Sequence, residues 1–165
     1  MKKGIVLTLI LAITVSCSAQ WGKKVKGNGD KVTIERATDD YDEIAVSEWF
    51  DVDLVDGKEG QLTLEGESNL LEYITTEVKN GKLYIKTENN VDLKPSDWKN
   101  GIYITVPIEK ISAISLSGSG NIVGKTTIKT EKLETAMSGS GDITLNVEAS
   151  TVSAIMSGSG DITLS

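Results

Sequence analysis

The sequence contains no histidine, and its single cysteine, Cys17, lies close to the N-terminus. Without histidine there is no Ser-His-Asp or Cys-His catalytic centre and no imidazole-bound metal. A single cysteine also excludes a disulfide framework and a cysteine-rich zinc site. We therefore predict that the protein is not an enzyme, that it uses no cofactor, and that it has no catalytic or cofactor-binding residues.

Aromatic side chains and positive charge are also scarce. Aromatic residues make up 5% of the chain, and none follows Tyr103. The net charge is −7, and it becomes −9 once the leader over positions 1–19, with Lys2 and Lys3, is removed. An acidic chain repels nucleic acid, and residues 104–165 offer no aromatic platform on which bases could stack. Nucleic acid is therefore excluded as a partner.

Long hydrophobic runs are absent apart from one near the start. Lys2 and Lys3 precede an apolar run over residues 5–15, and small residues follow it. Eleven residues are too few to cross a bilayer as a helix, so residues 1–19 are interpreted as a signal peptide. The sequence thus predicts an exported protein of the cell envelope, at the outer membrane or surface or in the periplasm.

Two cleavage patterns remain open for this leader. Cleavage after Ala19 would start the mature chain at Gln20 and leave it without cysteine. Cleavage before Cys17 would make that residue the lipidated first residue, although Thr14 stands where a lipoprotein signal usually has leucine. A lipid anchor at Cys17 is the only membrane contact that we predict.

The rest of the chain divides into a short lead-in and one domain. Residues 20–30 are polar, aperiodic and rich in glycine, which is typical of a flexible tether. From residue 31 to 165, short runs alternate apolar with polar residues and favour strands. Asn80-Gly81 predicts a tight hairpin, and Ser68 is expected to cap a single helical turn. The clearest predicted strands are 32–35, 50–54, 61–65, 82–86 and 102–106.

One motif occurs three times near the end of the sequence. It consists of an apolar residue, Ser-Gly-Ser-Gly, then Asn or Asp, and isoleucine, and its copies begin at positions 116, 137 and 156. Twenty residues at about 3.3 Å each are enough for one turn of a narrow coil. We therefore predict an all-β fold with a right-handed parallel β-helix, a solenoid of about 20 residues per coil, on which the earlier strands and hairpins stack. Two inner rows are expected, one of Leu116, Met137 and Met156 and one of Ile122, Ile143 and Ile162.

A polar residue follows each Ser-Gly-Ser-Gly corner: Asn121, Asp142 and Asp161. Stacked coils would bring the two carboxylates within about 5 Å of each other, where like charges raise a pKa or require a cation. Calcium-binding β-helices use a nine-residue glycine-aspartate repeat that supplies more oxygens. Turn capping is therefore the main interpretation of these residues, and a calcium ladder is the alternative.

Two acidic groups and one tryptophan complete the candidates. Paired carboxylates about 5 to 10 Å apart can hydrolyse glycosides, but no general acid stands out here, and solvated acidic faces are commoner. Trp98, in the loop after Pro95, is the candidate contact for a surface ligand, either a glycan or a protein. The acidic groups are Asp39, Asp40, Asp42 and Glu43, and Asp51, Asp53 and Asp56.

Several segments taken together resemble the head GIN domain family of "putative autotransporter adhesins", which are bacterial envelope proteins. The resemblance rests on residues 50–54, 78–83, 103–107 and 114–122 with its recurrences, and it covers most of the chain after the leader. It implies an all-β domain that ends in a parallel β-helix, with no established site residues to carry over. The chain has fewer recurrences than a full member, so the domain over residues 31–165 is expected to be truncated at its C-terminus.

The function predicted from the sequence is that of a non-enzymatic exported envelope protein, either an adhesin or a surface-interaction module. Two alternatives stay open, namely a polysaccharide-active enzyme on the same scaffold and a periplasmic scaffolding or sensing lipoprotein. An uncapped last coil ends in an unpaired strand edge. We therefore also expect self-association through the terminal coil.

Overall fold

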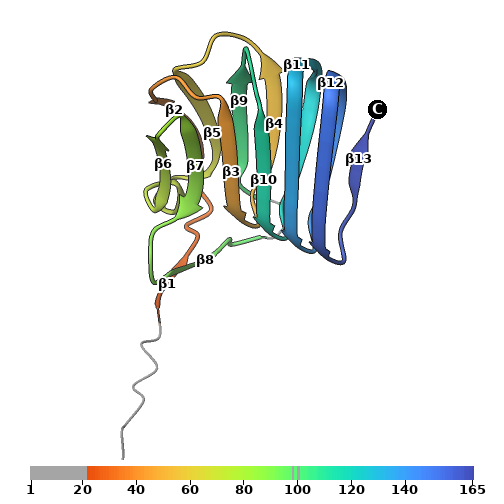
Figure 1. Cartoon of the computed structure of the whole chain (residues 1–165). Coiled ribbons are helices and arrows are strands. Elements are labelled where there is room, and N and C mark those ends of the chain that lie inside the picture. The colour runs from red at the N-terminus through yellow and green to blue at the C-terminus, as the bar shows by residue number, and fades with distance from the viewer. Residues whose placement is uncertain (1–21, 98, 100) are drawn as a thin grey trace, which may run out of the picture.

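The computed structural model describes residues 22–97, 99 and 101–165, which form thirteen strands and one helical turn. The elements are β1 (Lys23–Lys26), β2 (Lys31–Ala37), β3 (Glu43–Glu48), β4 (Asp51–Asp56), β5 (Gln61–Glu67), α1 (Ser68–Leu71), β6 (Ile74–Lys79), β7 (Lys82–Thr87), β8 (Val91–Lys94), β9 (Tyr103–Ile108), β10 (Ala113–Gly118), β11 (Asn121–Gly139), β12 (Asp142–Gly158) and β13 (Ile162–Leu164). Eleven strands form one sheet in the order β2-β5-β9-β4-β11-β10-β3-β7-β6, with β12 and β13 beyond β11 (Figure 1). A small parallel sheet of β1 and β8 lies beneath it.

The predicted parallel β-helix is wrong as the fold class, although the fold is all-β. The sheet is mixed and curls into a nearly closed, barrel-like body (Figure 1). Three strand pairs are antiparallel: β2 with β5, β5 with β9, and β6 with β7. The regular period holds only for the last strands, whereas β4 pairs with β11, far away in the sequence. Hairpins and long-range pairings therefore determine most of the fold, and a repeating coil does not describe it.

Within this sheet, the three motif copies lie side by side in register. Leu116 pairs with Met137 and Met137 with Met156, while Ile122 pairs with Ile143 and Ile143 with Ile162. The stacking of both predicted rows is therefore confirmed, but Met156, at the end of the first row, is 50% exposed and does not lie inside. The register between β11 and β12 shifts between Val123 and Thr127. Over this stretch β11 contains more residues than the paired part of β12, so β11 forms a bulge. This bulge accounts for the unequal spacing of the three motif copies.

Strand β11 connects the two faces of the curled sheet. Its first residues, from Asn121 to Gly124, pair with β4, and its last residues, from Glu134 to Gly139, pair with β10. The strand therefore crosses from one face to the other near its bulge, and β12 follows it along both halves. Bulges bend a strand and increase its twist, as this crossing requires.

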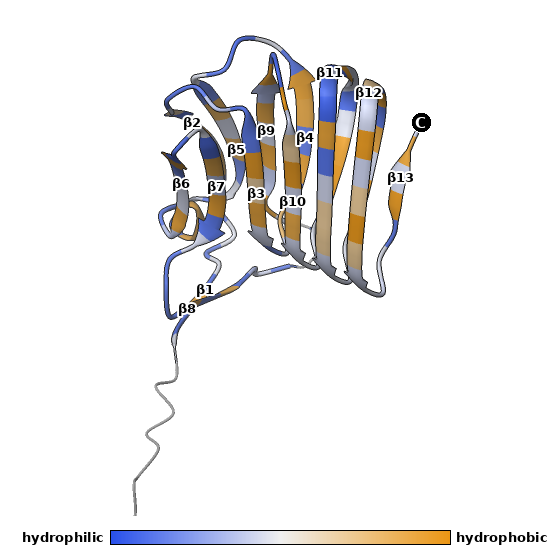
Figure 2. Cartoon of the chain, in the orientation of Figure 1, coloured by the Kyte–Doolittle hydropathy of each residue, from blue (hydrophilic) through white to orange (hydrophobic). Residues whose placement is uncertain are grey.

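Apolar and polar residues alternate along many of the strands (Figure 2), and the apolar residues of these strands make up most of the buried core. In β3, for example, Ile44 and Val46 are buried, and in β4 the buried residues are Val52 and Leu54. Phe50 is fully buried where the chain turns from β3 to β4. Each fully buried side chain of this size contributes about 1.5 to 3 kcal/mol relative to exposure. Side chains therefore fill the interior as a packed core.

Short-range predictions fared unequally. The hairpin between β6 and β7 is confirmed, and both turn residues, Asn80 (φ 53°) and Gly81 (φ 77°), have the positive φ of a type I′ turn. The helical turn α1 exists, but its predicted cap is wrong: Glu67 occupies the N-cap position without a side-chain capping bond. The Ser68 hydroxyl instead accepts a hydrogen bond of 2.8 Å from the Asn28 side chain.

The segment that leads into the domain is attached to its lower end. Residues 20–30 were expected to be a tether, and within them Lys23–Lys26 form β1, paired with β8. The buried carboxylate of Glu67 accepts hydrogen bonds from the backbone of Gly29 and, at 2.8 Å, of Ser96. It thereby joins the lead-in, the end of β5 and the loop after β8. The leader and Cys17 lie outside the described residues.

Candidate functional site

The Ser-Gly-Ser-Gly corners form a ladder at the lower end of the sheet. Gly118, Gly139 and Gly158 stack on one another, each with φ near 140°. The backbone N–H of the serine after each glycine donates to the layer below, as from Ser140 to the Gly118 carbonyl at 2.9 Å. A Cβ on Gly139 would lie 2.0 Å from that same oxygen, so the stacking requires glycine here.

The ladder has an additional first layer that the sequence analysis missed. The turn between β3 and β4 lies directly below the first corner, with Glu48 under Gly118 and Phe50 under Gly120. Glu48 adopts a φ of 97°, a conformation that non-glycine residues rarely take. Residues 46–52 match the motif in its apolar, first serine, Asx and β-branched positions but lack both glycines and the second serine. Because the search relied on glycine, this signal was overlooked.

The polar residue of each layer hydrogen-bonds with its neighbour. The Asn121 amide donates to Asp51 Oδ1 at 2.8 Å, and its oxygen accepts from the backbone N–H of Asp142 at 3.3 Å. Asp142 Oδ1 in turn accepts from the backbone N–H of Asp161 at 2.9 Å. These bonds satisfy the donors at each turn, so they support turn capping as the role of these residues.

The calcium ladder stays a prediction. Within residues 22–97, 99 and 101–165, no group of three or more His, Cys, Asp or Glu side chains is placed to hold a metal ion. Asp142 and Asp161 already use side-chain or backbone atoms in the hydrogen bonds of the ladder. No other cofactor site is indicated by the geometry of the corners.

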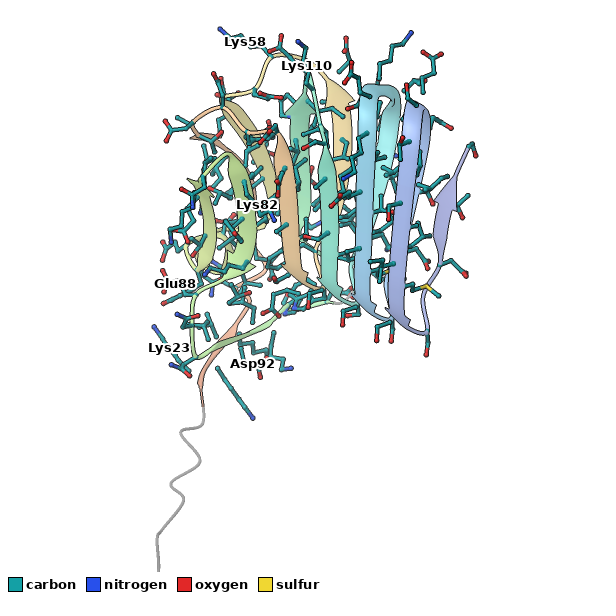
Figure 3. The ribbon with its side chains drawn as sticks, in the orientation of Figure 1. Lys23, Lys58, Lys82, Glu88, Asp92 and Lys110 are labelled. Atoms are coloured by element: carbon teal, nitrogen blue, oxygen red, sulfur yellow. The ribbon has the colours of Figure 1, made fainter. Side chains whose placement is uncertain are left out.

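At the opposite end of the sheet lie three neighbouring hollows that share lining residues, and we call them together the rim groove. The first hollow, of about 710 Å³, is lined by Asp40, Tyr41, Asp42, Asp56, Glu59, Gly81, Glu109 and Lys110. The second, of about 400 Å³, shares Asp56 and Glu109 with it and adds Ile108, Ile111 and residues 126–129. The third, of about 560 Å³, is lined by Lys110, Lys129, Thr130 and Glu131. Lys58 and Lys110 mark this end in Figure 3, whereas Lys23 and Asp92 mark the other end.

The groove has a marked charge gradient. Five carboxylates and one lysine line the first hollow, whereas two lysines and one carboxylate line the third. Connections that lie far apart in sequence supply these groups, because β3, β7 and β10 begin and β4 and β9 end at this rim. The first hollow can therefore attract a positively charged group, and the groove can accommodate an extended chain.

Two hydrogen bonds fix the wall of the first hollow. The Tyr41 hydroxyl donates to the Pro107 carbonyl at 2.5 Å, and burial, with the nearby Glu59 carboxylate, raises the pKa of Tyr41. The Glu59 carboxylate accepts from the backbone N–H of Glu109 at 3.1 Å. The connection before β3 and the loop after β4 are thus both attached to the end of β9.

The structure separates the acidic residues that the sequence grouped together. Asp40, Asp42 and Asp56 meet in the first hollow, whereas Asp39 lines a different hollow beside β6. Glu43 forms an ion pair with Lys82 at 2.7 Å, Asp53 forms one with Lys125 at 3.3 Å, and Asp51 belongs to the corner ladder. Sequence reasoning missed Glu59, Glu109, Lys110 and Lys129. The only signal for the first three is a charge just outside a predicted strand, and Lys129, inside β11, has no such signal.

The two other predicted contacts lie outside the described residues. These are Trp98, the candidate ligand contact, and Cys17, the candidate for lipidation. Trp49 is partly buried against the core and meets Phe50 edge to face at 5.5 Å between ring centroids.

Comparison with known proteins identifies a family that includes most of this chain. Residues 40–165 match the profile of the family described as "Putative auto-transporter adhesin, head GIN domain". A search of curated protein sequences found no match. The family description refers to adhesins, which are proteins of the bacterial envelope or surface.

Three of the solved structures with a similar fold come from Parabacteroides. A "putative lipid binding protein" from Parabacteroides distasonis superposes with a TM-score of 0.75 at 28% identity, over 86% of this chain and 63% of that one. A "putative adhesin" from Parabacteroides merdae gives a TM-score of 0.75 at 19% identity, over 86% and 59%. A second "putative adhesin" from Parabacteroides distasonis gives 0.66 at 24% identity, over 86% and 68%. The chain thus spans less than two thirds of the length of the first two structures.

No helix in the described part of the chain is both long enough and apolar enough to pass through a membrane.

Proposed function

Because the chain belongs to the head GIN domain family of "putative auto-transporter adhesins", we propose that it is a non-enzymatic envelope protein that binds a partner at the bacterial surface. We further propose that it is exported by residues 1–19, and that it is either anchored through Cys17 or cleaved after Ala19. The intact mass of the exported chain distinguishes these two forms, because lipidation adds the mass of the acyl chains.

The rim groove is the observation that carries the proposal for binding. It runs across the end of the sheet and is lined by side chains from separate connections, held in place by the Tyr41 and Glu59 hydrogen bonds. Surface loops held by a rigid sheet are common positions for binding residues. The groove is therefore the surface where we place ligand contact.

The charges of the groove favour a protein ligand with positive side chains. The first hollow concentrates five carboxylates around Tyr41, and the chain as a whole is acidic, so a lysine or arginine would be attracted there. A neutral glycan would gain nothing from this field. We therefore propose an extended protein segment whose basic side chains enter the first hollow and whose backbone follows the groove toward Lys129.

The name of the Parabacteroides distasonis relative includes lipid binding. We do not carry that property over, because the three hollows of the groove are lined mainly by charged and hydroxyl-bearing side chains. Buried acyl chains need an apolar lining.

Binding to an immobilised ten-residue peptide of alternating lysine and alanine tests the proposal. The double substitution Glu59→Gln and Glu109→Gln removes two charges from the groove and keeps side-chain oxygens as acceptors. Its control is Glu65→Gln with Glu134→Gln, which removes two charges from exposed positions elsewhere. We expect the groove variant to bind at least about fivefold more weakly than the control, and added salt to weaken binding by the wild type.

Equal losses in the two double variants would mean that only net charge attracts the peptide, and the groove would not be its site. Equal binding of a matching peptide of glutamate and alanine would also contradict the proposal.

A further inference from the structure

The curled sheet stays open between β2 and β6, and we call this gap the seam. The strand order of the sheet ends at β2 on one side and at β6 on the other, and no strand of the described part pairs with their outer edges. Both strands lie on the side of the body away from β13 (Figure 1). A strand added next to β13 would therefore not cover these two edges.

Arg36 closes only one end of the seam. Its guanidinium donates to the carbonyls of Leu71 and Ile74. Because a long side chain spans the gap and no backbone pair forms, β2 and β6 lie further apart here than the roughly 4.8 Å of paired strands. Beyond Arg36, a hollow of about 380 Å³ remains between the two strands. It is lined by Ala37, Thr38, Asp39, Thr76, Glu77 and Val78.

Unpaired backbone groups of β6 point toward this hollow. The Glu88 N–H donates to the Tyr73 carbonyl at 2.9 Å, so the backbone of Tyr73 faces β7. Successive residues of a strand turn their N–H and C=O groups to opposite neighbours. The carbonyl of Ile74 accordingly faces the seam, where Arg36 binds it. By the same alternation, Thr76 and Val78 direct their N–H and C=O groups into the open part of the seam.

The β2 side of the hollow also has unsatisfied polar groups. The Thr38 N–H donates to the Gly60 carbonyl at 2.9 Å, so the backbone of the preceding residue, Ala37, faces the seam. The side-chain oxygen of Thr38 is buried and has no hydrogen-bond partner among the described residues. Buried hydroxyl groups normally have one. A peptide backbone in the hollow would bring donors and acceptors to this wall.

The seam is acidic, and it leads into the first hollow of the rim groove. Asp39 and Glu77 are the charged residues that line the seam hollow, and Glu77 also pairs with Lys79 at 2.8 Å. The next residue after Asp39, Asp40, lines the first hollow, as does Gly81 in the turn that ends β6. A basic segment that enters the first hollow can therefore continue along β6 without leaving acidic surface.

We propose that the basic segment assigned to the rim groove continues into the seam and pairs as an added strand with the outer edge of β6. The identity of the segment rests on the proposed function, and the seam adds the way in which its backbone is held. Main-chain hydrogen bonds with Thr76 and Val78 give affinity in this mode of recognition. Alternate side chains of the segment would contact the partly buried Val78 or lie near Glu77, so small and basic residues should alternate.

Hydrogen exchange of the labelled full chain, followed by nuclear magnetic resonance, tests this inference with the lysine and alanine peptide. At a peptide concentration that occupies about nine tenths of the chain, the amides of Thr76 and Val78 should exchange about tenfold more slowly, because exchange then proceeds only through the free tenth. The amides of Thr75 and Glu77 face β7 and provide the control. Their exchange should not change.

A substitution on β6 provides a second test. Thr76→Pro removes the N–H that faces the seam but no hydrogen bond to β7, and edge strands tolerate proline at such positions. It should weaken peptide binding about fivefold, as the loss of one hydrogen bond predicts. Thr76→Ala keeps this N–H and should bind like the wild type. Equal binding by the proline variant would overturn the inference.

The shifts of Tyr41 and Lys110 in the same spectra report on the rim groove separately. Shifts there without slower exchange at Thr76 and Val78 would overturn the inference and leave the groove as the binding site. Slower exchange at these two amides without shifts in the groove would also overturn it, because the seam would then hold a segment that does not occupy the groove. If neither changes, the proposed function fails, and the inference fails with it.

Discussion

At the scale of single residues, two features constrain the fold most strongly. One is the stacked glycine corners of the ladder, and the other is the buried Glu67 carboxylate with its backbone hydrogen bonds. Gly139 combines a φ of 141° with close stacking on the Gly118 carbonyl, so both its conformation and its lack of a side chain are needed. Glu48 occupies the equivalent position in the first layer without being glycine. The bottom layer tolerates a side chain because no earlier corner of the ladder lies beneath it.

Gly139→Ala should therefore destabilise the protein severely. The new Cβ would lie 2.0 Å from the Gly118 oxygen, and alanine does not easily adopt this φ. Strain and overpacking of this kind cost about 3 kcal/mol or more. Urea unfolding measures the loss. Ser138→Ala, at an exposed neighbouring position, should change stability by less than about 0.5 kcal/mol. Comparable effects of the two substitutions would refute the stacking argument.

Glu67 should make stability depend on pH. Burial alone would raise the pKa of its carboxyl, but the hydrogen bonds from Ser96 and Gly29, together with the charge of Lys31, hold that pKa below its usual value of 4.5. Its contribution is therefore complete above about pH 4.5 and is lost as the pH falls through the lower, folded-state pKa.

Glu67→Gln should cost about 2 kcal/mol at pH 7, because the amide is a weaker acceptor for these backbone donors. The difference from the wild type should shrink as the pH falls below about 4.5. Denaturant unfolding at pH 7 and at pH 3 measures both values, with Glu65→Gln on the same strand as the control. A difference that does not change with pH would contradict the assignment.

At the scale of elements, the sheet stays open where β2 and β6 face each other, and Arg36 bridges that gap. Its guanidinium donates to the carbonyls of Leu71 and Ile74, so β2 is connected to α1 and the start of β6. Burial lowers the pKa of Arg36, yet an arginine stays protonated in proteins. The side chain thus replaces a strand pairing at the seam.

Arg36→Leu should destabilise the protein by about 3 kcal/mol, because two carbonyls lose a charged donor. Arg36→Lys should fall between the wild type and the leucine variant, since a lysine cannot reproduce the planar fork. Thermal unfolding of the series compares them, and Thr33→Leu controls for an added leucine on the same strand. If Arg36→Leu unfolds like Thr33→Leu, the seam does not depend on Arg36.

The sequence predicted the strands and the hairpin well, but it did not predict which strands pair over a long distance. Alternation and glycine identified the strands, the Asn80-Gly81 hairpin and the register of Leu116 with Met137, because these features are local or recur at a short spacing. The pairing of β4 with β11 joins distant parts of the sequence, and alternation shows which face of a strand is buried but not which strand is its neighbour. The β-helix prediction failed because the period of the last strands was taken to define the fold class, whereas the earlier strands join the same sheet, partly in antiparallel pairs.

At the scale of the whole molecule, the family and the rim groove together support binding at the bacterial surface. The family could be identified from the sequence because several short segments of this chain resemble those of the family. The groove could not, since Asp42, Asp56 and Glu109 meet only after the strand ends converge at one rim. The two ends of the body thus differ, with the stacked glycine corners at one and the charged rim groove at the other.

The most direct test of binding at the groove is nuclear magnetic resonance of the labelled chain during titration with the lysine and alanine peptide. We predict the largest amide shifts around the first hollow, at Tyr41, Gly81 and Lys110, and unchanged signals at the corner glycines Gly118 and Gly139. Shifts that are largest at the corners, or that are spread evenly over the sheet, would contradict the assignment of the ligand site to the rim groove.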